Sequence, residues 1–300
     1  MRILISGSSG FIGTSLFAHL KTKGHEVISL VRDEKKGGVF FPFEGKGDAS
    51  ALEKHFDAVI HLCGENIASG RWTKKKKQRL VESRINTTEQ LVRAINQLRD
   101  PPKHLLVASG LSYFGSRGDA WLTESSLPGE GFLANLCQDW EQAAKGAICP
   151  VSYLRFGMVL GPYGKKSALD QMIPLAKKGL SAVLGTGRQY LSWIHIDDAV
   201  RAVEWILKKS LEGPVNICSQ VPAQQKDFAN QLAKSLRRCR FLRIPSSILS
   251  LIIGEMAQEL LLASTRAMPD KLLKAGFCFK YPELEQALRE IISSTKTAAS

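Results

Sequence analysis

The first half of the chain alternates short apolar runs with amphipathic helical stretches. Strand-like runs occur at residues 2–6, 26–31, 57–62, 104–108 and 151–156. The helical patterns between them cover residues 11–23, 73–98 and 132–145. Short apolar strands that alternate with helices are typical of βαβ units, which build a parallel sheet with helices on both faces. The pattern predicts an α/β fold with a doubly wound sheet of the Rossmann type.

The regular alternation of strands and helices ends near residue 161. Helical patterns follow at 167–178, 198–208, 226–236, 246–262 and 282–292, with short strands near residues 182, 191 and 215. We interpret residues 1–160 as a nucleotide-binding domain and residues 161–295 as a smaller, mostly helical lobe for a substrate or partner, some segments of which return to the sheet. Disorder is expected only in the Ser/Thr/Ala tail from Ser293 to Ser300.

Composition and charge narrow the class of protein. The 300 residues are 44% hydrophobic, as in soluble globular proteins, and carry a net charge of +13. The basic residues cluster at Lys74–Lys77 and within 232–243, which indicates either solvated faces or a phosphate-rich ligand. No C-x-x-C pair or His at metal-ligand spacing accompanies the cysteines, so we expect reduced, mostly buried thiols and no metal site. The cysteines are Cys63, Cys137, Cys149, Cys218, Cys239 and Cys278.

Targeting signals are not expected. The first strand begins at Arg2, which leaves no room for a leader peptide, and Glu255 and Glu259 interrupt the most apolar later stretch. The sequence therefore predicts a cytoplasmic protein that does not cross a membrane.

Three glycines lie between the first strand and the first helix, in ISGSSGFIG. Gly7 permits a tight turn, Gly10 lets the backbone approach a pyrophosphate, and Gly13 lets the helix pack close to the strand. The helix N-terminus then offers N–H groups and partial positive charge to the anion. This motif predicts a dinucleotide site that includes Gly7, Ser9, Gly10, Phe11, Ile12 and Gly13.

The end of the second strand bears on the choice of nucleotide. An NAD site usually places an acidic side chain there for the ribose 2′-hydroxyl. Here Val31 ends the strand and Arg32 follows it, while Asp33 lies one step further. Because a guanidinium suits a 2′-phosphate, we predict NADP (NADPH) as the cofactor.

Five further stretches complete a resemblance to the extended, nucleotide-sugar-epimerase-like branch of the short-chain dehydrogenase/reductase superfamily. They are HLCGENI at 61–67, SGLSYFG at 109–115, RFGMVLGP at 155–162, WIHIDD at 193–198 and the C-terminal stretch 262–288. More narrowly, GENI followed by RW and SRI resembles the atypical epimerase-family proteins that carry a C-terminal domain of unknown function. Some of those proteins have been labelled cell-division regulators.

The resemblance implies a kept cofactor site and a changed catalytic one. It adds cofactor contacts at Leu62, Cys63, Gly64, Glu65, Arg84, Ser109, Gly157 and Met158. In the superfamily a Tyr donates a proton and a Lys four residues later lowers its pKa. Alignment through Glu141 puts the Tyr position at Leu133 and the Lys position at Cys137. Leu133 cannot donate a proton, and Cys137 carries no positive charge that would lower the pKa of a donor.

Another group could replace the missing acid. Tyr113, just past a strand end, is a candidate proton donor with Ser109 beside it, although a Tyr in such a loop more often lines the pocket. Arg188 and Gln189 are candidate substrate contacts from the second lobe. For Arg84, an exposed structural helix face remains an alternative to cofactor binding.

His195 is interpreted as a structural residue, and Asp197 or Asp198 as the N-cap of the following helix.

Three functions are consistent with these features. The first is an NADP(H)-dependent oxidoreductase or epimerase-like enzyme with an unidentified small-molecule substrate. The second is a catalytically silent NADP(H)-sensing regulator with a protein partner. Nucleic-acid binding ranks last because it rests on charge alone, without a recognised module.

Overall fold

The computed structural model describes residues 1–43, 52, 55–162, 167–178, 181–238 and 241–297. The chain forms two compact units, each assembled from separate segments. The first unit consists of Met1–Gly110, Leu136–Arg155 and Val200–Val215. The second consists of Leu111–Asn135, Phe156–Ala199 and Asn216–Ser300. The functional division into residues 1–160 and 161–295 stays a prediction.

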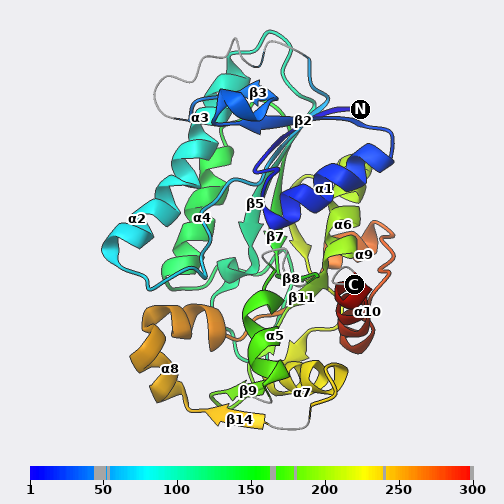
Figure 1. Cartoon of the computed structure of the whole chain (residues 1–300). Coiled ribbons are helices and arrows are strands. Elements are labelled where there is room, and N and C mark those ends of the chain that lie inside the picture. Colours follow the sequence, from blue (N-terminus) through cyan, green and yellow to red (C-terminus); the bar gives the residue numbers. More distant parts are fainter. Residues whose placement is uncertain (44–51, 53–54, 163–166, 179–180, 239–240, 298–300) are drawn as a thin grey trace. The chain divides into compact units, whose positions relative to one another are not determined.

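A seven-stranded sheet forms the centre of the first unit (Figure 1). Its strand order is β12-β7-β5-β4-β1-β2-β3. The strands are β1 (Arg2–Ser6), β2 (Glu26–Val31), β3 (Val39–Phe40), β4 (Ala58–His61), β5 (His104–Gly110), β7 (Val151–Phe156) and β12 (Gly213–Ile217). Neighbouring strands from β5 to β3 pair in parallel, which confirms the predicted α/β fold class.

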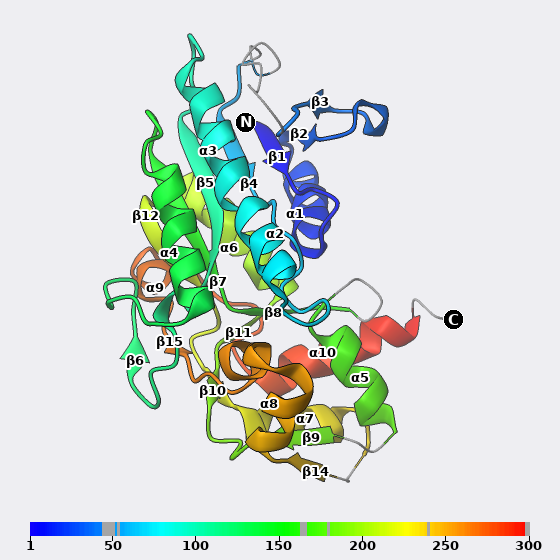
Figure 2. The ribbon, with the colours of Figure 1, turned by 90° about the vertical axis from the view of Figure 1, so that its left-hand side faces the viewer.

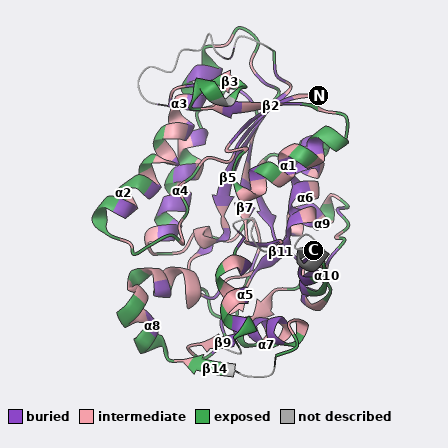
Figure 3. Cartoon of the chain, in the orientation of Figure 1, coloured by how far each residue is buried: buried purple, intermediate pink, exposed green. Residues whose placement is uncertain are grey.

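The apolar runs of the sequence become the inner strands because both faces of the sheet are covered. Ile3, Leu4 and Ile5 of β1 are fully buried, and Figure 3 shows the same burial along the neighbouring strands. Helices α2 (Lys74–Glu82), α3 (Ile85–Asn96) and α4 (Phe132–Ala144) lie over one face, and α1 (Phe11–Thr22) and α6 (Ile196–Lys209) over the other (Figures 1 and 2). This is the doubly wound arrangement.

The second unit has short strand pairs rather than one large sheet. The pairs are β8 (Met158–Leu160) with β11 (Trp193–His195), β9 (Ser181–Leu184) with β14 (Phe241–Ile244), β10 (Tyr190–Leu191) with β13 (Ala223–Gln224), and β6 (Trp121–Leu122) with β15 (Arg266–Ala267). Its further helices are α5 (Leu169–Lys177), α7 (Gln225–Ser235), α8 (Ser246–Ile253), α9 (Asp270–Lys274) and α10 (Leu284–Thr297). Trp193, Phe228 and Leu288 lie in its apolar core.

Two predicted helices are each interrupted. The helix expected over 73–98 is two helices, because Ser83 and Arg84 form a turn between α2 and α3. The helix expected over 246–262 ends at Ile253, because the next residue, Gly254, has a φ of +73° that leaves the helical region. A π-helical turn, η4 (Ala257–Leu261), lies further along.

The remaining sequence predictions concern the tail, the thiols and the membrane. The tail was expected to be disordered from Ser293, but α10 continues to Thr297, and residues 298–300 lie outside the described residues, as does Cys239. Cys137, Cys149 and Cys218 are buried free thiols, whereas Cys278 is exposed. In the part of the chain that the structure describes, no helix has the length and apolar character needed to cross a bilayer.

Candidate functional site

The turn between β1 and α1 depends on two glycines that tolerate no side chain. Gly7 has φ +72°, and a Cβ there would lie 2.8 Å from the carbonyl carbon of Leu62. A Cβ on Gly13 would lie 2.1 Å from the carbonyl oxygen of Gly7. The N–H of Gly10 closes the turn on the Gly7 carbonyl at 3.0 Å. These contacts agree with the tight turn predicted at Gly7 and the close helix packing predicted at Gly13, while the approach of a pyrophosphate to Gly10 stays a prediction.

The N-terminus of α1 has no side-chain cap. Gly10 is its N-cap, with extended geometry (φ −76°, ψ 171°), and no side chain caps the helix. The first helical hydrogen bond runs from the N–H of Thr14 to the Gly10 carbonyl. The preceding amides, with the positive end of the helix dipole, therefore suit a pyrophosphate, and Ser9 and Gly10 are exposed to solvent.

Arg32 is exposed at the end of β2, one residue beyond the half-buried Val31. Burial raises the pKa of the Cys63 thiol, while the Ser6 hydroxyl and the positive charge of Arg32 oppose that rise. Arg32 is thus close enough to the end of β4 to act on it electrostatically. Its predicted contact with a 2′-phosphate stays a prediction.

The segment after β4 is held by side chains from the turn that follows α2 and from Trp72, which precedes α2. The Arg84 guanidinium donates to the Glu65 carbonyl at 2.9 Å, and the Ser83 hydroxyl accepts from the Glu65 N–H at 3.0 Å. Trp72 donates its indole N–H to the Ile67 carbonyl at 2.9 Å. The GENI, RW and SRI stretches of the sequence are therefore in contact with one another in the folded chain.

Arg84 is buried against this segment. A Cβ on Gly64 would lie 3.1 Å from its Cζ, and its guanidinium lies 5.1 Å from the Trp140 ring centroid. Burial lowers the pKa of Arg84 to about 10. The structure gives Arg84 partners within the chain, and its contact with a cofactor stays a prediction.

The lysine run is not a uniformly solvated face. Lys76 is buried and its ammonium donates to the Glu65 carboxylate at 2.6 Å and to the Asn66 carbonyl at 2.8 Å. The hydrogen bond from Lys76 holds the pKa of Glu65 below its usual value. Sequence reasoning missed this role, because Lys76 has the same identity as its exposed neighbours Lys74 and Lys75.

His61, the last residue of β4, was also missed. It is fully buried, and burial lowers its pKa to about 3, so the imidazole is neutral. Its Nδ1 lies 2.7 Å from the hydroxyl of Ser6, directly before the Gly7 turn, and its Nε2 lies 3.3 Å from the Thr87 hydroxyl. A neutral histidine is therefore hydrogen-bonded to the residue directly before the glycine turn.

Ser109 lies at the end of β5 in a buried polar network of the first unit. Its hydroxyl donates to Glu141 at 2.8 Å, and Arg155 binds both oxygens of that carboxylate at 2.7 Å. Burial raises the pKa of the neighbouring Cys137 thiol to about 11. The network holds the Ser109 hydroxyl in place.

Tyr113 belongs to the second unit. It lies in the 3-10 turn η3 (Leu111–Phe114), half-buried, with its ring edge-on to that of Phe114 at 5.4 Å. It packs against a small apolar cluster that includes Leu122 and Ala267. Its role as an acid stays a prediction.

The N-terminus of α4 receives a carboxylate from a distant part of the second unit. Glu259 accepts from the N–H of Phe132 at 2.9 Å and from the N–H of Leu133 at 3.0 Å. Gly131 has φ +112°, and a Cβ there would lie 2.3 Å from a Glu259 oxygen. The only sequence signal was that Glu259 interrupts an apolar stretch.

The other candidates of the second unit have contacts within it. Gly157 approaches the Ser192 carbonyl so closely that a Cβ would lie 2.5 Å from it, and Met158 begins β8 with its N–H on the same carbonyl. Gln189 is buried and donates to the carbonyls of residues 184 and 261, while Arg188 is exposed. Substrate contact by either residue stays a prediction.

The helix cap at α6 differs from the prediction. His195 accepts from the N–H of Asp197 at 3.1 Å, so the imidazole caps the helix, and its Nε2 lies 2.9 Å from Glu290. Asp197 and Asp198 lie inside the first turn. Asp198 instead accepts from the N–H groups of Lys280 and Tyr281, each at 2.8 Å.

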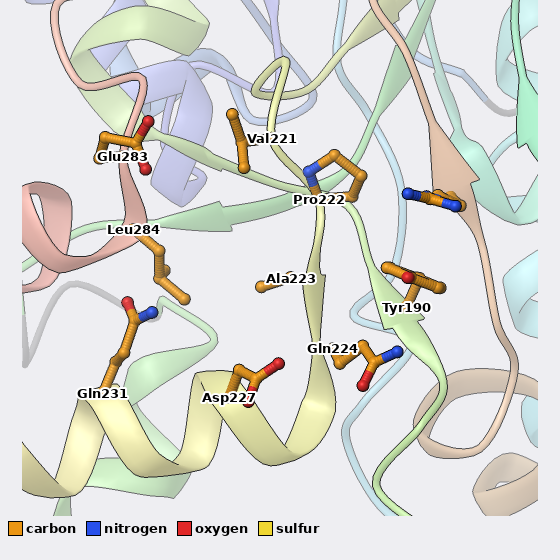
Figure 4. Close-up of a pocket in the computed structure, with 10 residues that line it drawn as sticks. Tyr190, Val221, Pro222, Ala223, Gln224, Asp227, Gln231, Glu283 and Leu284 are labelled. Carbon is orange, nitrogen blue, oxygen red and sulfur yellow. The ribbon is translucent and has the colours of Figure 1, made fainter. Parts of the chain in front are cut away.

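Two of the cavities formed by the described residues of the second unit are large enough to note. The larger, of about 520 Å³, has Asp227 and Gln231 of α7 on one side and Tyr190 on another (Figure 4). The Arg266 guanidinium, which also lines it, lies 4.5 Å from the Tyr190 ring centroid. The smaller cavity, of about 240 Å³, is lined by Ser112, Gly115, Ser116, Glu130, Leu133, Gln258, Glu259, Leu262, Ala263 and Thr265. Among the described residues no cluster of His, Cys, Asp or Glu suits a metal ion.

Comparison with known proteins agrees with this architecture. The model of the NAD-dependent epimerase/dehydratase family matches residues 3–218, and a domain of unknown function, DUF1731, matches residues 244–291. The epimerase family protein Mb2239 of Mycobacterium bovis is 39% identical over 95% of this chain and 96% of its own length.

Solved structures show the same fold. The human epimerase family protein SDR39U1 (isoform 2), crystallised with NADPH, has a TM-score of 0.89 and 31% identity over 98% of this chain and 99% of its own. UDP-glucuronic acid 4-epimerase from Bacillus cereus has a TM-score of 0.79 over 99% of this chain and 100% of its own, at 20% identity, which shows the fold alone. The family match, the near full-length relatives and the glycine turn agree: this chain belongs to the NAD-dependent epimerase/dehydratase family.

Proposed function

We propose that this protein is an NADP(H)-binding oxidoreductase or nucleotide-sugar-epimerase-like protein. The observation that carries the proposal is the glycine turn before α1, where Gly7 and Gly13 exclude side chains and Gly10 leaves the helix without a side-chain cap. The NADPH in the crystal structure of human SDR39U1 supports the choice of ligand.

Different residues of the chain would bind different parts of the dinucleotide. The amides of Phe11 and Ile12 would bind the pyrophosphate, and Arg32 would bind the 2′-phosphate. The segment Leu62–Glu65, kept in place by Arg84, would lie beside the nucleotide. When bound, the nicotinamide would give or take a hydride.

Proton transfer in such an enzyme would fall to Tyr113. Ser109 has its own proton committed to Glu141, so it would accept a hydrogen bond from the ligand rather than give one. Tyr113→Phe should then remove turnover and leave NADPH binding intact. Turnover that survives in Tyr113→Phe would remove this assignment and leave the enzyme class standing.

A second candidate function is a catalytically silent NADP(H)-sensing regulator. It is favoured by Leu133 and Cys137 of α4, the two positions to which we assign the superfamily's Tyr and Lys. Leu133 is 1% exposed and Cys137 is 6% exposed, and the buried thiol has a pKa of about 11. Neither can donate a proton near neutral pH, and both serve as packing residues.

One experiment separates these functions. Ligand-stripped protein is titrated with NADPH by calorimetry and then incubated with NADPH and a panel of aldehydes, ketones and UDP-sugars. Binding with slow oxidation of NADPH supports the enzyme, and binding without turnover on the whole panel supports the regulator. Retention on a polyanion matrix that NADPH does not displace would instead support nucleic-acid binding.

A further inference from the structure

The larger cavity of the second unit has polar atoms on two sides that find no hydrogen-bond partner among the described residues. We propose that it binds a short peptide with free termini, of about three residues. The C-terminal carboxylate of this peptide lies on Arg266, and its N-terminal ammonium lies beside Gln231. The proposal is independent of the dinucleotide site, because every residue that lines the cavity belongs to the second unit.

Arg266 is held in place at one side of the cavity. Its Cζ lies 3.9 Å from the ring centroid of Trp121 and 4.5 Å from that of Tyr190, and its Nη1 donates to the Asp119 carbonyl at 3.3 Å. Its Nε is buried and has no partner among the described residues. A ligand carboxylate on the Nε–Nη2 edge would remove the cost of that unpaired donor. A guanidinium presents these N–H groups as a planar fork, which suits the two oxygens of a carboxylate.

Gln231 lies on the side of the cavity formed by α7. Its Oε1 is a buried acceptor that receives no hydrogen bond within the described chain. Asp227 precedes it by four residues and therefore lies on the same face of the helix. Figure 4 shows both side chains on the side of α7 that faces Ala223, with Glu283 on the side of Gln231 and away from Tyr190. An ammonium has three N–H donors and can serve the Gln231 oxygen and a carboxyl group together.

The distance between the two sides sets the length of the ligand. Tyr190, which contacts Arg266, pairs with Gln224 directly before α7. Gln231 lies six residues after Gln225, which is about 9 Å along a helix that rises 1.5 Å per residue. An extended chain spans roughly 3.3 to 3.6 Å per residue, so about three residues bridge the two sides. A single amino acid is too short.

The wall between the two sides and the size of the cavity agree with a peptide. Pro222, Ala223 and Leu284 line the cavity with apolar groups, and Val221, which is 42% exposed, lies at its opening to solvent. The volume of about 520 Å³ is within the range of roughly 300 to 1,000 Å³ that is typical of small-molecule sites. Small side chains such as alanine therefore suit this wall.

The test uses peptides that differ by one terminal charge. Trialanine, N-acetyl-trialanine, trialanine amide and free alanine are titrated into the full chain by calorimetry and saturation-transfer NMR. We expect trialanine to bind about tenfold or more tightly than each of the other three. That ratio is the scale of one lost hydrogen bond to a charged group.

Two variants assign the termini of the peptide to the two sides. In Arg266→Gln, trialanine and its amide should bind within about threefold of each other, because the partner of the carboxylate is gone. In Gln231→Leu, the preference for trialanine over the N-acetyl form should fall to about threefold, because the acceptor for the ammonium is gone. The Gln231 Oε1 accepts no hydrogen bond from a described residue, so this variant tests the proposal even where Arg266→Gln is unstable.

Controls separate this inference from folding and from the cofactor. Arg243→Gln removes a charge from an exposed position outside the cavity lining and should leave every ratio unchanged. Thermal melting checks that the variants stay folded, and NADPH titration on the same samples tests the proposed function separately. Four results would each overturn the proposal: no binding of millimolar trialanine, equal binding of the capped peptides, tighter binding of inorganic phosphate, or unchanged ratios in the folded variants.

Discussion

Two helices of this protein begin after a glycine, and they satisfy their first amides in different ways. At α1, Gly10 supplies no side-chain cap, and the turn before the helix is exposed at Ser9 and Gly10. At α4, the space beside Gly131 is filled by the carboxylate of Glu259. The α4 contact shows how an acid fits at such a helix end in this chain. The comparison supports the proposal that the α1 end binds a ligand, whereas the α4 end already holds a carboxylate of the chain itself.

Filling the turn at α1 should have the largest effect. In Gly13→Val the side chain would collide with the Gly7 carbonyl, so NADPH affinity should fall at least a hundredfold, with some loss of stability. Gly10→Ala, whose Cβ lies a tight but tolerable 3.3 Å from the same carbonyl, should weaken NADPH about tenfold and keep the fold. Calorimetry and melting curves measure both. Gly146→Ala, which meets nothing within 4 Å, is the control.

Low pH should destabilise the folded protein through His61, which is hydrogen-bonded to Ser6 directly before the glycine turn. His61 has a pKa of about 3 in the folded chain and about 6.5 when unfolded, so its stabilising effect is complete above pH 6.5 and is lost as the pH falls toward 3. Below pH 6, protonation of His61 on unfolding should lower the folded-to-unfolded ratio about tenfold for each unit by which the pH falls. Urea unfolding at several pH values tests this, with His61→Gln expected to lose that part of the pH dependence. Identical profiles would refute the role of His61.

Arg32→Ala sharpens the choice of nucleotide at the α1 site. The loss of a charge-assisted hydrogen bond should weaken NADPH by about 1 to 3 kcal/mol and leave NADH nearly unchanged. Paired calorimetric titrations measure the difference. Lys35→Ala, at a nearby exposed position, serves as a charge control. Equal losses for the two nucleotides would rule out the 2′-phosphate contact.

Removing the internal cap should have the smallest of these effects. Glu259→Ala leaves the Phe132 and Leu133 amides without their carboxylate and should lower the free energy of unfolding by about 1 to 2 kcal/mol, as for other lost N-caps. Urea unfolding measures it, and Glu255→Ala is the matched control. NADPH affinity should not change, because this cap serves α4. A stability equal to that of the control would show that water caps the helix as well.

The sequence was sufficient for features that depend on local pattern. The apolar runs and the three glycines predicted the parallel sheet and the turn at Gly7, because strand period and turn geometry are local properties. The family marks also identified a segment, GENI, that the structure shows to be tightly held.

Features made by distant contacts could not be read from the sequence. The turn at Ser83 and Arg84 contains no Pro or Gly; both side chains there bind the backbone of Glu65, 18 and 19 residues away. Lys76 is buried by the same segment, and Glu259 reaches an amide 127 residues away. Each depends on the tertiary fold, which overrides local pattern.

Calorimetric titration of the ligand-stripped protein with NADPH decides whether the turn before α1 holds a dinucleotide. We expect one site per chain, an affinity that falls with added salt, and tighter binding of NADPH than of NADH. If millimolar NADPH, NADP⁺, NADH and NAD⁺ all fail to bind the folded protein, then the glycine turn at α1 is not a dinucleotide site and the proposed function is wrong.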